Sequence, residues 1–339
     1  MRIMTCDQNA FLLSRLQRGI PVSAHPFTQL ASECCTSEQY IFDLLESLRS
    51  DGTLRRFGAV YDARRLGFHS VLCAASVPPA ELERYAAFAS ECSGVTHCYQ
   101  RGVPDGANGY PNLWFTLAAP SAGFDRELSK LQAKFAPCTI HALPATKRFK
   151  IDVVFNLATR ATDERTEPAT PLTETGWKTD APVFDITADE WKIVRAMQGD
   201  MKLHHEFFLP VAQELGMKHE ALLEKIADWK TKGIIRRIGA VLRHNKIGFT
   251  ANGMCCWMLP PERCEAAGRA LAQCVEVTHC YERPPLPTFP FRLYAMIHAN
   301  SQERAKSIFK RISEHAGLSA ADGDILFSLR EFKKTSLVF

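Results

Sequence analysis

The sequence contains one segment in two copies, IRRIGAVLRHNKIGF at residues 235–249 and LRRFGAVYDARRLGF at residues 54–68. In both copies a pair of arginines precedes a short apolar run, which is followed by polar and cationic residues and a Gly-Phe step. This order is typical of a strand that runs into a turn. The copies differ most in the turn, where Arg243-His244 replaces an Asp-Ala pair. We therefore expect specialised chemistry at that difference.

Composition places the chain among ordinary soluble proteins. It has 339 residues, of which 46% are hydrophobic and 23% charged, so it is long enough for two domains with substantial cores. The net charge of +4 does not by itself indicate a nucleic-acid binder. The 12 cysteines show no CxxC spacing, which favours free thiols in a reducing compartment. The N-terminus lacks the apolar core of a signal peptide and no stretch is apolar enough to cross a bilayer, so we expect a cytoplasmic location and no membrane partner.

The duplication extends beyond these segments. His97 has its counterpart in His279, and Leu113 in Leu293, at a constant offset of about 180 residues. A segment rich in Thr, Glu and Pro separates the copies and is typical of a linker. We predict a helix-turn-helix-like domain at 1–54, a ferredoxin-like domain at 55–157, a linker at 158–182, a second helix-turn-helix-like domain at 183–235 and a second ferredoxin-like domain at 236–339.

Each half opens with segments whose apolar residues recur at helical spacing and which end at a glycine such as Gly52 or Gly233. Three short helices before an arginine-led strand indicate a winged helix-turn-helix. Strand-like and helical runs then alternate, which favours an α+β fold with a βαββαβ, ferredoxin-like domain in each half. The expected strands are 68–77, 95–101, 112–117 and 149–155 in the first half, and 253–259, 275–283, 292–298 and 327–332 in the second.

A His-x-Tyr-x-Arg triplet occurs once in each half, and strand alternation places its three side chains on one face. It combines a proton donor, an amphipathic ring and a carboxylate-binding guanidinium. The alternative is a buried histidine that hydrogen-bonds to the backbone. The triplets are His97, Tyr99 and Arg101, and His279, Tyr281 and Arg283.

The paired arginines of the duplicated segment precede a strand, so neighbouring side chains point to opposite faces. At most one of Arg55 and Arg56, and one of Arg236 and Arg237, is expected to reach a common site. Trp114 is either a stacking surface for a ligand or part of the core, and the sequence favours neither.

These motifs together resemble a known enzyme family. The helix-turn-helix followed by βαββαβ is the layout of the Lrp/AsnC regulators, but the repeated Arg-Arg-x-Gly-Ala-Val and the Val-Thr-His-Cys-Tyr-x-Arg motifs at 95–101 and 277–283 resemble the siroheme decarboxylases. The first half is similar to the D-type or A-type subunit, through LPATKRFK at 143–150, and the second to the L-type or B-type subunit, through Leu-Arg-His at 242–244. One departure is Arg292, where the first half has Asn112.

The resemblance implies that two related subunits, here fused, remove carbon dioxide from the C12 and C18 acetates of siroheme on the way to haem or haem d1. The iron tetrapyrrole is then the substrate, and no external cofactor is expected. Its many carboxylates require arginines and lysines, and the carbanion requires a proton donor. The resemblance makes His244, His279 and His97 the candidate catalytic residues, with His279 or His244 as a candidate ligand of the substrate iron. Because Arg243-His244 belongs to the same half as His279, that half is favoured for acid chemistry. The candidate substrate-binding residues are Arg55, Tyr99, Arg101, Trp114, Lys147, Arg148, Lys150, Arg236, Arg237, Arg243, Tyr281 and Arg283.

Two other functions compete with this one, a DNA-binding regulator and a haem-binding sensor without catalysis. The helix expected near 36–49 carries three acidic residues and one arginine, which phosphate would repel. Two diverged copies also lack the two-fold symmetry that a palindromic operator requires. We therefore expect no DNA binding and an internal pairing of the fused halves, while a homodimer of the whole chain stays open.

Overall fold

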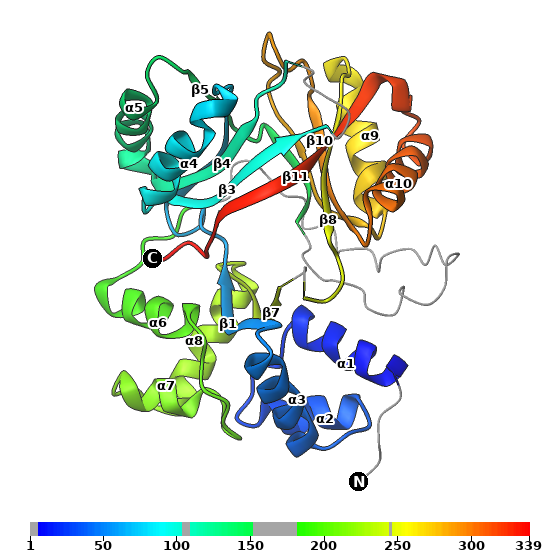
Figure 1. The fold of residues 1–339 in the computed structure, drawn as a ribbon. Helices are drawn as coiled ribbons and strands as arrows, with labels where there is room; N and C mark the ends of the chain where they lie inside the picture. The colour runs from blue at the N-terminus through cyan, green and yellow to red at the C-terminus, as the bar shows by residue number, and fades with distance from the viewer. Residues whose placement is uncertain (1–5, 104–108, 152–181, 244–245) are drawn as a thin grey trace.

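The structure is a computed structural model that describes residues 6–103, 109–151, 182–243 and 246–339. Two helical domains lie at one end of the molecule and two α/β layers at the other (Figure 1). The helices are α1 (Cys6–Arg18), α2 (Pro26–Glu33), α3 (Glu38–Ser50), α4 (Leu82–Glu91), α5 (Phe124–Phe135), α6 (Ala188–Gln198), α7 (Leu209–Glu214), α8 (His219–Thr231), α9 (Pro261–Gln273) and α10 (Gln302–His315). The strands are β1 (Leu54–Tyr61), β2 (Phe68–Ala75), β3 (Val95–Gly102), β4 (Leu113–Pro120), β5 (Ile140–Leu143), β6 (Lys147–Ile151), β7 (Ile235–Leu242), β8 (Ala251–Trp257), β9 (Val277–Glu282), β10 (Leu293–Ala299) and β11 (Gly323–Lys334).

The helical domains have the predicted three helices each, and local capping explains where they begin. The Ser37 hydroxyl accepts a hydrogen bond from the Tyr40 amide at the start of α3. Thr187 and Glu190 form a capping box at the start of α6. Such caps satisfy amide groups that have no partner within the helix. Buried residues of both domains form one shared hydrophobic cluster, so the two domains pack as a unit.

The duplicated segments pair with each other as a two-stranded antiparallel ribbon of β1 and β7. Gly58 lies opposite Gly239 in this ribbon. A Cβ atom on Gly58 would collide with the carbonyl oxygens of Gly199 and Met197, and one on Gly239 with that of Leu16. The glycine shared by both copies therefore lets the chain at the ends of α6 and α1 lie against the ribbon.

The other nine strands form one sheet in the order β5-β2-β4-β3-β11-β8-β10-β9-β6. In each half the four ferredoxin-like strands lie in the order 4-1-3-2, with β5 as the fourth strand of the first half and the beginning of β11 as that of the second. The expected fourth strand at 149–155 was therefore misassigned. The strand that fills this place, β5, has only 4 residues, too few for its alternation to stand out.

Each half also sends an extra strand to the other half. β6 pairs with β9, and the second part of β11 pairs with β3. Phe149 of β6 packs against the core of the second half, and Phe332 of β11 against the core of the first. The exchanged strands cover edges that would otherwise expose unpaired backbone groups.

Helices α4 and α5 lie on one side of the molecule and α9 and α10 on the other, with the strands between them (Figure 1). A separate hydrophobic cluster packs between the two half-sheets. It consists of Ala74, Trp114, Leu143, Met254, Cys256, Phe289, Phe291, Tyr294 and Leu326.

Within the described residues, no helix has both the length and the apolar character needed to span a membrane.

Candidate functional site

The triplet of the second half is assembled on β9. The rings of His279 and Tyr281 stack at a centroid distance of 6.0 Å, and the Arg283 guanidinium lies 4.8 Å from the centre of the Tyr281 ring. The Thr278 hydroxyl donates to the Met296 carbonyl oxygen at 3.1 Å and lies 3.1 Å from His279 Nδ1. Because that hydroxyl has a single proton, it accepts from Nδ1–H. The neutral imidazole therefore carries its proton on Nδ1 and presents the lone pair of Nε2.

The charges around His279 keep it neutral. Burial lowers the pKa of His279 to about 3. The positive charges of Arg236, Arg283 and Lys150 contribute to this decrease in pKa. At neutral pH His279 is therefore a base rather than an acid in the free protein.

The first half repeats the arrangement on β3. The rings of His97 and Tyr99 stack at 6.3 Å, and the Arg101 guanidinium lies 5.2 Å from the centre of the Tyr99 ring. His97 Nδ1 lies 2.9 Å from the Thr96 hydroxyl. Burial lowers the pKa of His97 to about 4. The predicted same-face triplet is therefore present in both halves.

The guanidinium groups of the triplets are buried without a carboxylate. Arg101 is 7% exposed and Arg283 8%. Arg101 donates to the Leu326 carbonyl oxygen and Arg283 to that of Leu143, while Arg283 Nε has no hydrogen-bond partner among the described residues. Burial lowers the pKa of both arginines. Isolated buried charge is costly, so these groups favour an incoming anion.

One arginine of each pair acts on a triplet histidine, but Arg55 and Arg56 both donate to the Ser336 hydroxyl, so strand alternation does not separate this pair. The charge of Arg55 affects His97 and that of Arg236 affects His279. Arg237 donates to the Gln17 carbonyl oxygen in the helical domain, so this sequence-based candidate lies away from the triplets. Arg56 likewise donates to its own strand, at Ala59 O.

The turns after β1 and β7 reach the opposite halves. Arg64 forms an ion pair with Asp62, with 2.8 Å between Arg64 Nη2 and Asp62 Oδ2, and its charge acts on Tyr281 of the second half. Arg243, which is exposed and donates to Gly52 O, lies near Arg55 of the first half. The antiparallel ribbon thus places Arg243 beside the first half, although the sequence groups it with His279. His244 lies outside the described residues.

The cations of β6 point in different directions. Arg148 lies opposite Tyr281 and its charge affects that tyrosine. Lys147 forms an ion pair with Glu265 of α9, and Lys150, only 3% exposed, donates to the Cys274 carbonyl oxygen at the end of α9. Both lysine amines thus reach helix α9, although the charge of Lys150 also acts on His279.

Trp114 belongs to the core between the half-sheets. It is 1% exposed, packs against Phe289 at 5.1 Å, and donates its indole N–H to the Pro111 carbonyl oxygen at 2.7 Å. Its hydrogen bond and its packing both explain its position without a ligand.

Three charged residues near the triplets were missed as candidates. Arg64, Glu331 and Lys334 all act on the triplet tyrosines or histidines. Comparing the halves position by position offers a signal for Glu331, which is the counterpart of Arg148. Among the residues that the structure describes, no group of three or more His, Cys, Asp or Glu side chains is placed to hold a metal ion.

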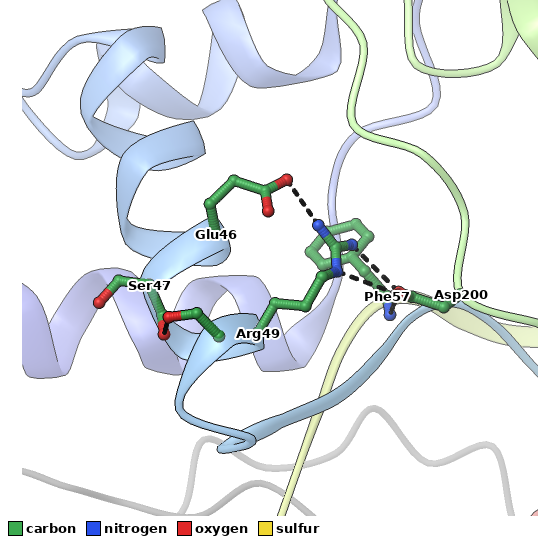
Figure 2. Close-up of polar contacts among 6 residues, drawn as sticks. Glu46, Ser47, Arg49, Phe57 and Asp200 are labelled. Atoms are coloured by element: carbon green, nitrogen blue, oxygen red, sulfur yellow. Dashed lines mark hydrogen bonds and ion pairs between the residues drawn. The ribbon is translucent and has the colours of Figure 1, made fainter.

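Helix α3 exposes acidic residues, and its arginine is paired with carboxylates. Its exposed residues include Asp43 and Glu46. Arg49 donates to Glu46 at 2.7 Å and to Asp200 at 3.1 and 3.2 Å, and Asp200 also accepts from the Phe57 amide (Figure 2). The arginine of this helix is therefore used to join the two halves, and the rest of the helix would repel phosphate.

Comparisons with known proteins agree with this architecture. The family model described as an AsnC-like ligand binding domain matches residues 65–150 and 246–333. The model described as a siroheme decarboxylase NirDL-like HTH domain matches residues 10–55 and 190–236. A siroheme decarboxylase of Hydrogenobacter thermophilus is 35% identical, over 97% of this chain and 93% of its own length. The chain belongs to the siroheme decarboxylase family.

Other members of the siroheme decarboxylase family show that the chain is a fusion. The siroheme decarboxylase NirDL subunit of Paracoccus pantotrophus is 29% identical over 98% of this chain and 97% of its own length. The siroheme decarboxylase beta subunit of Methanosarcina barkeri covers only 43% of this chain with 95% of its own length, at 38% identity. A crystal structure of the siroheme decarboxylase NirDL in complex with an iron-uroporphyrin III analogue has a TM-score of 0.69 and 31% identity, and the match covers 98% of this chain and 94% of that chain.

Proposed function

We propose that this chain is a siroheme decarboxylase that converts the C12 and C18 acetates of siroheme to methyl groups, giving 12,18-didecarboxysiroheme for haem or haem d1 synthesis. In this reaction the chain acts as a carbon-carbon lyase. The observation that carries the proposal is the pair of His-Tyr-Arg triplets with their buried arginines. Arg101 and Arg283 are desolvated and have no carboxylate among the described residues, which suits a polycarboxylate substrate.

The reaction breaks the bond between an acetate methylene and its carboxylate. Carbon dioxide leaves, and the electron pair stays on the methylene carbon, where the conjugated macrocycle delocalises it. A proton then completes the methyl group, so the step is balanced without an oxidant or a reductant. We therefore propose that the reaction needs no external cofactor.

The protein must supply that proton at a residue which is neutral before the substrate binds. His279 Nε2 presents a lone pair, because Nδ1–H donates to Thr278. A substrate carboxylate beside it would raise its pKa, so that Nε2 takes up a proton and later gives it to carbon. The same lone pair suits the alternative role of a ligand to the substrate iron, and His97 is then the remaining described candidate for proton transfer.

The cations position the substrate. Arg283 lies beside the Tyr281 ring, and Arg236 acts on His279 from the ribbon. Charge-assisted hydrogen bonds to carboxylates are strong and directional, so several of them fix which acetate meets the histidine. Removal of the carboxylate charge at one acetate weakens that contact, which favours release of the product side chain.

The proposal is tested by incubating the purified chain anaerobically with siroheme alone and following the product by mass spectrometry. We expect the loss of two carbon dioxide molecules. His279→Ala and His97→Ala should each slow product formation roughly 100-fold or more, in the range typical of general acid-base groups. The exposed His315 of α10 provides the matched control, because His315→Ala should leave the rate unchanged. A chain that binds siroheme and releases no carbon dioxide would be a haem-binding protein without catalysis.

A further inference from the structure

The two triplets differ at one equivalent position on the exchanged strands. On β6, Arg148 lies opposite Tyr281 of β9. On β11, Glu331 lies opposite Tyr99 of β3. The two strands occupy corresponding edges of the two halves. A cation in one triplet is thus replaced by a carboxylate in the other.

Glu331 engages the first triplet directly. Glu331 lies opposite Tyr99 in the strand pairing, and its charge raises the pKa of Tyr99 beyond the effect of burial. The charge of Glu331 also raises the pKa of Arg55 and Lys334, against the lowering caused by burial. Arg55 in addition donates to the Ser336 hydroxyl at 3.1 Å. Arg55 and Lys334, the cations beside the first triplet, therefore already feel the charge of a protein carboxylate.

The second triplet has the opposite character. Arg283, Arg148, Arg236 and Arg64 all act to lower the pKa of Tyr281, against the dominant effect of burial. A carboxylate that bound here would meet four guanidinium groups and the phenol hydroxyl.

The carboxylate of the protein near this triplet is already paired. Asp62 accepts two hydrogen bonds from Arg64, at 2.8 and 3.1 Å, and its charge acts on Arg148. Arg283 has the Leu143 carbonyl oxygen as its acceptor and an Nε without a hydrogen-bond partner among the described residues, while Arg148 only feels the charge of Asp62. These two arginines are therefore the groups that gain most from an external carboxylate.

We propose that the carboxylates of the substrate bind at the triplet of the second half, and that Glu331 repels them from the triplet of the first. The inference rests on the proposed function for the identity of the substrate and adds which half holds its acidic side chains. Glu331 is exposed at the rim of the first triplet, where a fixed negative charge acts on the approaching anion. A tetrapyrrole with carboxylates on its whole periphery would then be bound in one orientation rather than in two.

The test is a titration of the full chain with iron uroporphyrin III, followed by the change in its absorption spectrum. We expect Arg148→Gln to weaken binding roughly 10- to 100-fold, as for loss of a charged hydrogen bond. Glu331→Gln should leave binding unchanged or strengthen it. Thermal melts of each variant show whether it has folded. If Glu331→Gln weakened binding as much as Arg148→Gln, the two residues would serve one symmetric site and the inference would fail.

The charge exchange Arg148→Glu with Glu331→Arg gives a second, independent result. Arg148→Glu alone should weaken binding beyond Arg148→Gln. Adding Glu331→Arg to Arg148→Glu should increase the affinity at least tenfold over Arg148→Glu alone. The reason is that the new arginine creates in the first half the cationic environment that was removed from the second. A double variant no better than Arg148→Glu alone contradicts the inference. Because these titrations measure binding without turnover, they remain interpretable even if the chain releases no carbon dioxide.

Discussion

Replacing Arg283 by methionine separates its cost to the fold from its value to the ligand. The guanidinium is 8% exposed, with one carbonyl acceptor at Leu143 and an Nε that has no hydrogen-bond partner among the described residues. Replacing the guanidinium stabilises the fold because a charge no longer has to be buried. It also destabilises the fold by about 1–3 kcal/mol, because the Leu143 carbonyl loses its hydrogen-bond donor. We expect these effects nearly to cancel, so the free energy of unfolding in urea should change by less than about 2 kcal/mol.

Ligand binding should respond much more strongly to Arg283→Met. Losing a buried charged contact to a carboxylate costs about 2–5 kcal/mol, which corresponds to a decrease in affinity of roughly 30- to 5000-fold. The measurement is a spectral titration with iron uroporphyrin III, beside urea unfolding of the same preparation. Arg101→Met is the matched control, since it removes the equivalent buried guanidinium from the first triplet, where we propose that no substrate carboxylate binds. If Arg283→Met lost more than about 3 kcal/mol of stability and kept its affinity, the arginine would be structural.

Three further outcomes follow from the geometry. The pKa of His279 is lowered from 6.5 to about 3, so as the pH falls the imidazole is protonated in the unfolded state before it is protonated in the folded state. The free energy of unfolding therefore decreases between pH 6.5 and pH 3. His279→Gln should remove about 2 kcal/mol of the difference in unfolding free energy between pH 7 and pH 5. Trp114→Phe should cost about 1–3 kcal/mol in urea unfolding through the unpaired Pro111 carbonyl and leave the affinity for iron uroporphyrin III unchanged; a large loss of affinity would return the ring to the binding site. Asp200→Ala should lower the unfolding free energy by about 1 kcal/mol, because it removes the acceptor of the Phe57 amide; an unchanged urea midpoint would contradict this.

The sequence was sufficient for features that depend on local pattern. The helices of both helical domains, the βαββαβ order and the common face of His279, Tyr281 and Arg283 follow from periodicity and alternation within a few residues. It was not sufficient for strand pairing between distant segments. The pairing of β6 with β9 and of β11 with β3 depends on which edges are open after each half has folded, and no local pattern records that. For the same reason Lys147 and Lys150 were grouped with Arg148, although their amines reach α9.

The exchange of strands also changes which half of the sequence supplies the charged residues around each triplet. Within the sequence, the turn with Arg243 belongs to the half of His279, and the turn with Arg64 to the half of His97. The antiparallel ribbon and the exchanged strands reverse this assignment, so that each triplet is completed by charges from the other half. Tyr281 meets Arg148 only when both halves are present, so the site that we propose needs both halves, either fused in one chain or paired as separate subunits.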